Sequence, residues 1–181
     1  MAAPDFPASP TVGQTYTAPS GLIYTWDGKV WTTTAGAPAT FVTGRVIRST
    51  AQSAAHATAT DIIFSAAEGA IAVGMWSAGN PTRLVAPVDG YYIFGGSMEF
   101  APNTTGVRVL YLRFGAGLIE KGKTVVPVTT AAGGPCAMTA VAGSNMVAGD
   151  YVVLSVYHDS GAPLNINASP FPPNFWMAKV G

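Results

Sequence analysis

The sequence has little charge. Only 10% of its 181 residues are Asp, Glu, Lys or Arg, whereas an average globular domain has about 25%, and 49% of the residues are hydrophobic. Nine basic residues balance nine acidic ones, and the basic residues are scattered along the chain. This pattern excludes the basic patch by which proteins bind nucleic acid or an anionic membrane. Because so few charges face water, we expect something other than water to cover part of the surface.

Cysteine, histidine and long apolar runs are also scarce. Cys136 is the single cysteine, so an intrachain disulfide and a thiolate zinc site are excluded. Neither His56 nor His158 has the neighbours of a metal or catalytic motif, and no G-x-S-x-G nucleophile motif occurs. Apolar runs end far short of the roughly 20 residues that cross a bilayer. We therefore expect no catalytic activity, no cofactor, no bound metal and no membrane partner. The alternative for metal is calcium bound by Asp61, Asp89 and Asp159, should they converge, although their spacing does not resemble an EF-hand loop.

Aromatic residues gather around a turn near the N-terminus. Residues 22–26 and 29–33 are β-prone and are separated by Asp27-Gly28, a dipeptide favoured in two-residue type I′ hairpins. A hairpin arm of about thirty residues cannot enclose a core, so its rings need a partner. We expect them to dock onto another protein, the alternative being that they fold back onto the rest of the chain. The predicted partner-binding residues are Phe6, Tyr16, Tyr24, Trp26 and Trp31.

This segment resembles a short N-terminal module of structural proteins of tailed bacteriophages. The shared pattern is F-P-x-x-P-x-x-G-Q-x-Y followed by Y-x-W-D-G-x-x-W. The residues of this chain that match it are Phe6, Pro7, Pro10, Gly13, Gln14, Tyr16, Tyr24, Trp26, Asp27, Gly28 and Trp31. The resemblance implies a virion protein that attaches to its neighbours through residues 1–34. Small residues at 35–40 predict a linker, and six extended residues span at most about 20 Å.

From residue 41 to residue 181 the sequence predicts many short strands separated by Gly and Pro turns, with no amphipathic helix between them. The predicted strands are residues 41–48, 61–64, 69–75, 83–85, 90–100, 107–114, 124–128, 136–141, 151–157 and 176–180. Such a series is typical of an all-β, antiparallel sandwich or jelly roll.

Three segments in this region resemble the TNF-like jelly roll, which is shared with the globular heads of complement. Residues 86–94, APVDGYYIF, and 147–157, VAGDYVVLSVY, are similar to two of its characteristic strands. Residues 175–181, FWMAKVG, resemble its last, central strand, although the usual small-residue pattern is only loosely kept. The resemblance implies a compact homotrimer, and versions of this fold occur in phage heads and fibres.

Several predicted strands are apolar on both faces. In residues 90–100, for example, Tyr92 and Phe94 mark a core face, while Tyr91 and Ile93 on the other face are apolar as well. Strands of this kind usually have both faces covered, and without helices the second cover must be another subunit. The predicted trimer-interface residues are Tyr91, Ile93, Val107, Val109, Tyr111, Tyr151, Val153, Tyr157 and Trp176.

These patterns favour a homotrimeric decoration (cement) protein on the capsid surface of a tailed phage. It is expected to bind the major capsid protein, or another virion structural protein, and to stabilise the expanded head. The chain start carries no secretory signal, so we expect synthesis in the host cytoplasm. One alternative is a tail, neck or head fibre with a receptor- or carbohydrate-binding head, although the short linker leaves no room for a shaft. A more distant alternative is a secreted lectin-like recognition domain.

Overall fold

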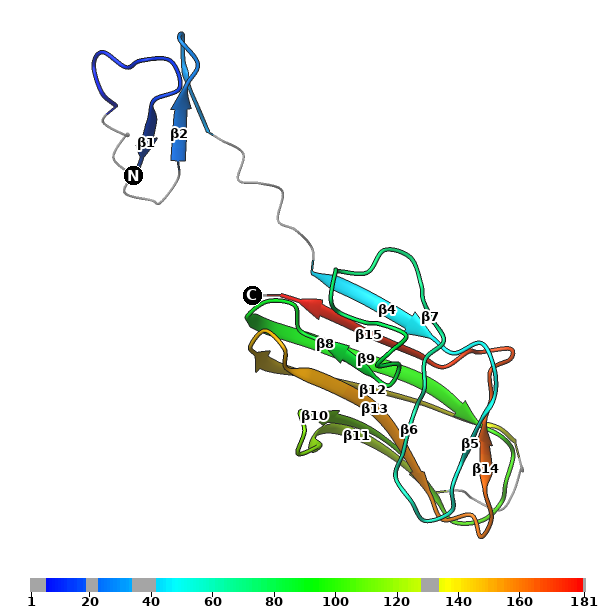
Figure 1. The fold of residues 1–181 in the computed structure, drawn as a ribbon. Coiled ribbons are helices and arrows are strands. Elements are labelled where there is room, and N and C mark those ends of the chain that lie inside the picture. Colours follow the sequence, from blue (N-terminus) through cyan, green and yellow to red (C-terminus); the bar gives the residue numbers. More distant parts are fainter. Residues whose placement is uncertain (1–5, 19–22, 34–41, 128–133, 181) are drawn as a thin grey trace. The chain divides into compact units, whose positions relative to one another are not determined.

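The computed structural model of the chain contains two compact units, Met1–Thr40 and Phe41–Gly181 (Figure 1). The residues that it describes are 6–18, 23–33, 42–127 and 134–180. The predicted linker at 35–40 lies outside the described residues. In the described parts every regular element is a β-strand, and no helix is long and apolar enough to cross a membrane.

The first unit is a three-stranded antiparallel sheet in the order β1-β2-β3. Its strands are β1 (Thr15–Thr17), β2 (Ile23–Trp26) and β3 (Trp31–Thr33). The predicted hairpin corresponds to β2 and β3. Strand β1 was not predicted, because three residues with a single ring between two threonines carry no alternation long enough to recognise.

The turn between β2 and β3 is longer than predicted. Trp26 pairs with Trp31, so the loop has four residues, and Gly28 alone of the Asp27-Gly28 pair has a positive φ, at 102°. A type I′ turn requires positive φ at both positions, so that prediction was wrong. The Asp27 carboxylate explains the longer loop, because it accepts hydrogen bonds from the backbone N–H groups of Lys29 (2.7 Å) and Val30 (2.8 Å).

The second unit consists of two antiparallel sheets that face each other (Figure 1). The seven-stranded sheet has the order β5-β14-β9-β15-β4-β7. Strand β12 also pairs with β9, along the edge opposite to the one that β14 and β15 share. The strands of this sheet are β4 (Thr43–Ile47), β5 (Gln52–Ala54), β7 (Ala66–Ala67), β9 (Gly90–Phe100), β12 (Cys136–Met146), β14 (Leu164–Ile166) and β15 (Asn174–Lys179).

The five-stranded sheet has the order β11-β10-β13-β6, and β8 also pairs with β13. Its strands are β6 (Thr60–Asp61), β8 (Arg83–Val85), β10 (Val107–Phe114), β11 (Ile119–Pro127) and β13 (Tyr151–His158). Strands that lie far apart in the sequence are thus neighbours in space, which is typical of a jelly roll.

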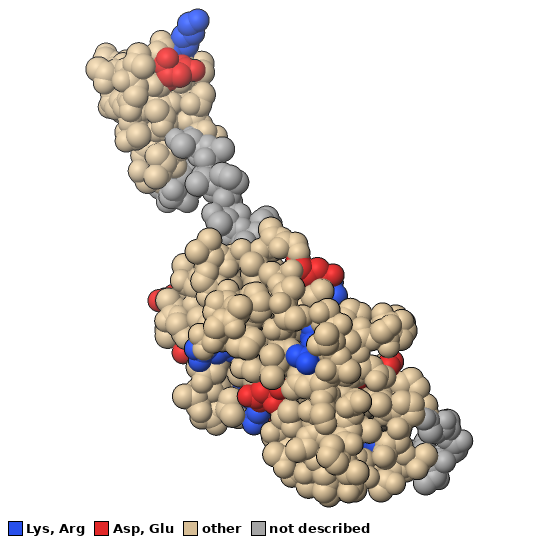
Figure 2. Space-filling model, turned by 45° about the vertical axis from the view of Figure 1, so that its right-hand side comes forward, with Lys and Arg blue, Asp and Glu red and all other residues tan. Residues whose placement is uncertain are grey.

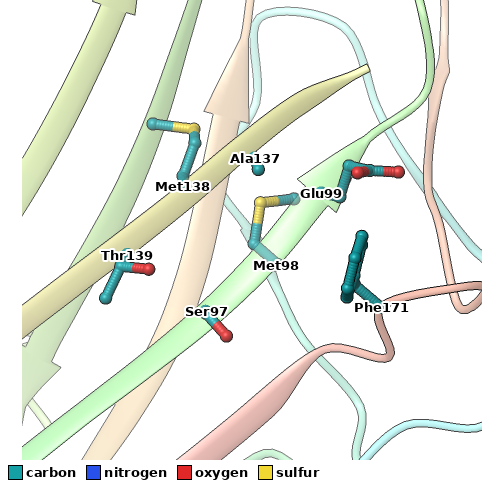
Figure 3. Close-up of a pocket in the computed structure, with 7 residues that line it drawn as sticks. All are labelled: Ser97, Met98, Glu99, Ala137, Met138, Thr139 and Phe171. Atoms are coloured by element: carbon teal, nitrogen blue, oxygen red, sulfur yellow. The ribbon is translucent and has the colours of Figure 1, made fainter.

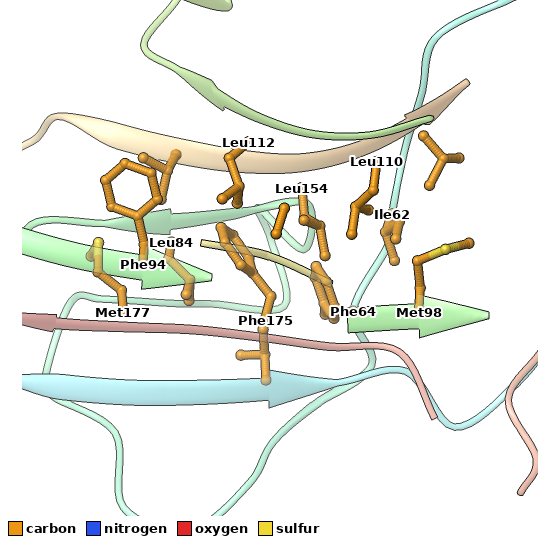
Figure 4. Packing of buried hydrophobic residues seen from close by; sticks show 14 of the residues in the cluster. Ile62, Phe64, Leu84, Phe94, Met98, Leu110, Leu112, Leu154, Phe175 and Met177 are labelled. Atoms are coloured by element: carbon orange, nitrogen blue, oxygen red, sulfur yellow. The ribbon is translucent and has the colours of Figure 1, made fainter. Parts of the chain in front are cut away.

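Residues from the inner faces of both sheets form one core (Figure 4). Phe94, Phe175 and Met177 from the seven-stranded sheet meet Leu110 and Leu154 from the five-stranded sheet, and all five are fully buried. They occupy alternate positions of their strands, as the two-residue period of an extended chain requires. The core face predicted for residues 90–100 is therefore correct.

Several predicted strands have other bounds in the structure, and two of them are absent or nearly so. Residues 69–75 form a loop, in which Gly74 turns the chain with φ at 82°. The segment is apolar because it covers the sandwich, where Ile71 packs against the core and the Ala72 N–H donates to the Thr43 carbonyl (2.9 Å). Of the predicted strand at 61–64, only Asp61 belongs to β6.

Candidate interaction surface

One face of the second unit is apolar, smooth and open. It is formed by the outward side chains of β9, β12 and β15 around Gly95, at the end of β9 where Tyr91 lies, and we call it the flat face. Trp176 on β15 lies opposite Gly95 on β9, which in turn lies opposite Val141 on β12. Tyr91 and Ile93 continue the same side of β9. Three predicted interface residues, Tyr91, Ile93 and Trp176, therefore lie together on this face, and Val141 is a member that the sequence analysis did not include.

Two glycines allow the aromatic rings to lie close to the sheet. A Cβ atom on Gly95 would lie 2.8 Å from the Ala140 carbonyl oxygen and from Cζ2 of Trp176, and 3.0 Å from Cγ2 of Val141. A Cβ atom on Gly143 would lie 2.6 Å from Oη of Tyr91. Because such distances are too short for real carbon atoms, the rings can cover these two positions only while they carry no side chain. The result is a surface with low relief, which a flat partner can approach closely.

The flat face carries almost no charge. Among the outward positions of β9, β12 and β15, the charged side chain is Glu99, which is buried. At the margin, Arg45 on β4 forms an exposed ion pair with Glu68 at 2.8 Å. In the view of Figure 2, charged side chains lie at scattered positions on the second unit, between larger areas of uncharged residues. Val141 keeps 56% of its surface exposed, so apolar area remains available to a partner.

The other predicted interface residues lie on the opposite side of the sandwich. They point outward from the five-stranded sheet and are Val107, Val109 and Tyr111 on β10 and Tyr151, Val153 and Tyr157 on β13. The nine candidates therefore do not form one surface. The alternation of residues along a strand shows which side chains share a face, but it does not show which of the two sheets the strand joins. The distribution of the nine candidates over two sheets could therefore not be predicted.

Part of this second face is already covered within the subunit. Val109 and Val153 are buried, so they have little surface left for a partner. The Arg113 guanidinium pairs with the Asp61 carboxylate and also donates through Nε to the Ser155 hydroxyl (2.9 Å). These polar contacts lie between β10, β13 and β6. The five-stranded sheet is thus less apolar on its outside than the flat face.

The five aromatic residues of the first unit form a cluster. The Phe6 ring lies 5.1 Å from Tyr16, 5.0 Å from Tyr24 and 5.1 Å from Trp31, on which it stacks with an interplanar angle of 10°. Trp26 lies 5.6 Å from Trp31. These rings therefore provide partners for one another, which neither of the two expectations from the sequence included. All five remain half-buried, so each ring still has surface to offer.

A groove of about 350 Å³ lies on the same side of the seven-stranded sheet as the flat face, toward the other end of β9 (Figure 3). Its lining comes from β9, β12 and the loop between β14 and β15. The lining residues are Ser97, Met98, Glu99, Ala137, Met138, Thr139 and Phe171. The groove was not predicted from the sequence, although the phenylalanine between prolines at 170–172 was a signal that could have been used.

The buried polar residues have structural partners. His158 is fully buried, with Nε2 3.0 Å from the Ala54 carbonyl and Nδ1 2.9 Å from the Ser160 hydroxyl. Arg108 is fully buried too, and burial lowers its pKa. Its guanidinium donates to the Thr105 carbonyl at 2.9 Å. Among the described residues, no group of three or more His, Cys, Asp or Glu side chains is arranged to hold a metal ion.

Comparisons with known proteins establish the fold. No family model and no curated protein matches the sequence. Among solved structures, murine APRIL has a TM-score of 0.57 at 11% identity, covering 77% of this chain and 99% of its own. Eiger TNF from S. frugiperda has a TM-score of 0.56 at 10% identity, with 78% and 93% covered. The globular domain of the zebrafish complement 1qA protein has a TM-score of 0.51 at 14% identity, and the match covers 77% of this chain and 97% of that domain.

These likenesses concern the fold. The resemblance of the N-terminal segment to phage modules stays a prediction. The chain contains a jelly roll of the type found in TNF and in the globular heads of complement, as its strand motifs predicted.

Proposed function

We propose that this protein is a homotrimeric decoration protein of a tailed-phage capsid. Its jelly rolls assemble through the flat face, and its N-terminal units bind the major capsid protein or another structural protein of the virion. The observation that carries the proposal is the flat face, where the side chains of Tyr91, Trp176 and Val141 lie over Gly95 and Gly143 and remain partly exposed. The number of subunits rests on the resemblance to trimeric jelly rolls.

The energetics favour assembly. Each Å² of apolar surface removed from water contributes about 25 cal/mol, so a few hundred Å² per subunit contribute several kcal/mol. Association then costs part of this gain through lost translation, rotation and side-chain freedom. A surface with almost no charge avoids the further cost of burying unpaired ions. The flat face meets these conditions better than the outside of the five-stranded sheet, where the Arg113–Asp61 pair lies.

The first unit supports a role in attachment. Its rings are already ordered around Phe6, so little conformational entropy is lost when they bind. Three linked units bind with an avidity well above that of one unit, provided that their sites on the shell can be reached together. A trimer that binds the expanded shell more tightly than the unexpanded shell stabilises it by the difference in binding free energy.

Deleting residues 1–34 tests the proposal. The truncated protein should keep its oligomeric state in analytical ultracentrifugation and lose co-sedimentation with expanded capsids. Phe6→Ala in the full chain is the companion variant, because it removes the ring at the centre of the cluster and leaves the jelly roll unchanged. Unchanged capsid binding by the truncated protein would show that the attachment role of the first unit is wrong.

The groove beside Phe171 favours a second candidate, the recognition head of a fibre. In that case purified protein should bind host cells, and labelled protein should be found on tails or neck fibres and not on heads. Copy number and position in electron micrographs of the virion distinguish the two functions directly.

A further inference from the structure

The groove is built around a glutamate residue that has little exposed surface. Glu99 is only 7% exposed, although it points outward from β9 and lines the groove. One of its carboxylate oxygens, Oε1, accepts a hydrogen bond from the Asn167 amide at 2.7 Å. Among the described residues, no hydrogen bond to Oε2 is seen, and Oε2 is not one of the buried side-chain atoms that lack a partner. This oxygen therefore keeps some contact with solvent on the groove side and can accept a hydrogen bond from a bound molecule.

The loop that carries Phe171 is attached to the groove at both ends. At one end Asn167 donates to Glu99, and at the other the Asn174 amide donates to the Ser97 hydroxyl oxygen. Both acceptors are outward residues of β9. Figure 3 shows the Phe171 ring beside the Glu99 side chain. The two asparagines therefore hold both ends of the loop against β9.

The loop is also stiff and its ring is open to solvent. Phe171 has Pro170 before it and Pro172 and Pro173 after it, and each proline fixes its own φ. The Pro173 carbonyl accepts a hydrogen bond from the Arg48 N–H at 3.0 Å. Phe171 is nevertheless 67% exposed. A large apolar ring that is held in place and left uncovered is typical of a binding residue, because little entropy is lost when a ligand packs on it.

Hydroxyl groups complete the lining. The Ser97 oxygen accepts from Asn174, which leaves its proton free to donate. Thr139 on β12 pairs with Ser97 in the sheet and brings a second hydroxyl. The groove thus combines a carboxylate that accepts, two hydroxyls that donate and accept, and one aromatic face. Its volume of about 350 Å³ lies in the range of small-ligand sites.

We propose that this groove binds a neutral saccharide. A pyranose ring has hydroxyls that can donate to Glu99 and exchange hydrogen bonds with Ser97 and Thr139, and its C–H face can pack on the Phe171 ring. A simple cation would satisfy the carboxylate but would offer no acceptor for the protons of the two hydroxyls. The inference goes beyond the capsid role and does not depend on it, because it concerns a site at the end of β9 away from Tyr91.

A glycan array probed with the labelled full-length protein tests the inference, followed by titration of the best methyl glycoside by saturation-transfer NMR. Phe171→Ala should weaken binding at least tenfold, because it removes the packing surface. Glu99→Gln should do the same while keeping the shape of the side chain and an oxygen for Asn167 to donate to. Ile119→Ala is the matched control, since Ile119 is an exposed apolar residue of the five-stranded sheet. It should leave binding unchanged.

Three results would overturn the proposal. The first is no glycan signal above that of the Phe171→Ala protein. The second is binding that neither groove variant weakens. The third is saturation transfer to choline or methylguanidinium, offered as cationic probes, in place of the glycosides. Near-UV circular dichroism of each variant confirms that it is folded. Loss of capsid binding after deletion of residues 1–34 is a separate readout, so the two proposals fail independently.

Discussion

Replacing Val141 by glutamate is the sharpest test of the flat face. Val141 lies outward on β12, an edge strand, directly opposite Gly95. Its side chain lies over Gly95 on the same face as the Trp176 ring. It is 56% exposed in the single subunit, so a longer polar side chain can be accommodated there without repacking the core. In an assembly built on the flat face, the same position is covered, and a carboxylate would be buried.

The magnitude follows from the exposure of Val141. Burying a valine completely contributes about 1.5–3 kcal/mol, so burying the part still exposed contributes about 1 kcal/mol per subunit. In a trimer the three equivalent positions give about 3 kcal/mol, which corresponds to a roughly hundredfold weaker association constant. The buried carboxylate adds several kcal/mol per site if no cation pairs with it. Together these losses should abolish assembly at micromolar concentration.

Val125→Glu is the matched control. Val125 is 49% exposed and lies on β11, where it pairs with Val109 on the outside of the five-stranded sheet. Sedimentation velocity over a range of micromolar concentrations should show a monomer for Val141→Glu and an unchanged oligomer for Val125→Glu. Urea unfolding of both variants as monomers should differ little. The reverse result would place the interface on the five-stranded sheet, and a monomeric unmodified protein would refute the reasoning for both faces.

Two further predictions concern single residues. Gly96→Ala should lower the free energy of unfolding, measured in urea, by about 1–3 kcal/mol, because the new Cβ would lie 2.7 Å from the Asn174 carbonyl oxygen. Gly143→Ala should lower it by less than about 1 kcal/mol, because the new Cβ meets only the movable end of the Tyr91 side chain. Hydrogen bonds from Val30 and Lys29 lower the pKa of Asp27 below its ordinary value of 3.8. The carboxylate therefore stabilises the first unit fully above that value and less as the pH falls through the folded-state pKa. The Lys29 and Val30 amide NMR signals should shift with that transition in the unmodified protein, and Asp27→Asn should remove the shift.

Much of the second unit could be predicted because its long strands alternate clearly. The bounds predicted for 83–85, 90–100 and 107–114 coincide with β8, β9 and β10. The strands that were missed, β5, β7 and β14, have two or three residues each. Such segments contain no full period of alternation, and pairing with neighbours defines them. The loop at 69–75 has the composition of a strand because it is packed against the core.

The site was harder to predict than the fold. The rings of the first unit were expected to need an outside partner, but stacking of Phe6 on Trp31 depends on a contact across 25 residues that periodicity cannot supply. The groove depends on Asn167 and Asn174 meeting two neighbouring outward positions of β9. Contacts between distant segments of this kind arise only when the chain is folded, and no local pattern marks them.

The adjacent glycines of β9 both serve the fold, and one of them also shapes the surface. Gly96 points inward, and its missing side chain leaves room for Leu154 and for the Asn174 carbonyl, so the sandwich itself needs it. Gly95 points outward, and a Cβ there would lie 2.8 Å from the Ala140 carbonyl oxygen on β12, so the close pairing of β9 with β12 needs this glycine as well. A glycine inside a strand weakens it. At Gly95 the same missing side chain also lets the Trp176 indole lie over β9, because a Cβ would lie 2.8 Å from Cζ2 of the ring. The low relief of the flat face, against which another surface can lie closely, is therefore a consequence of a glycine that the sheet already requires.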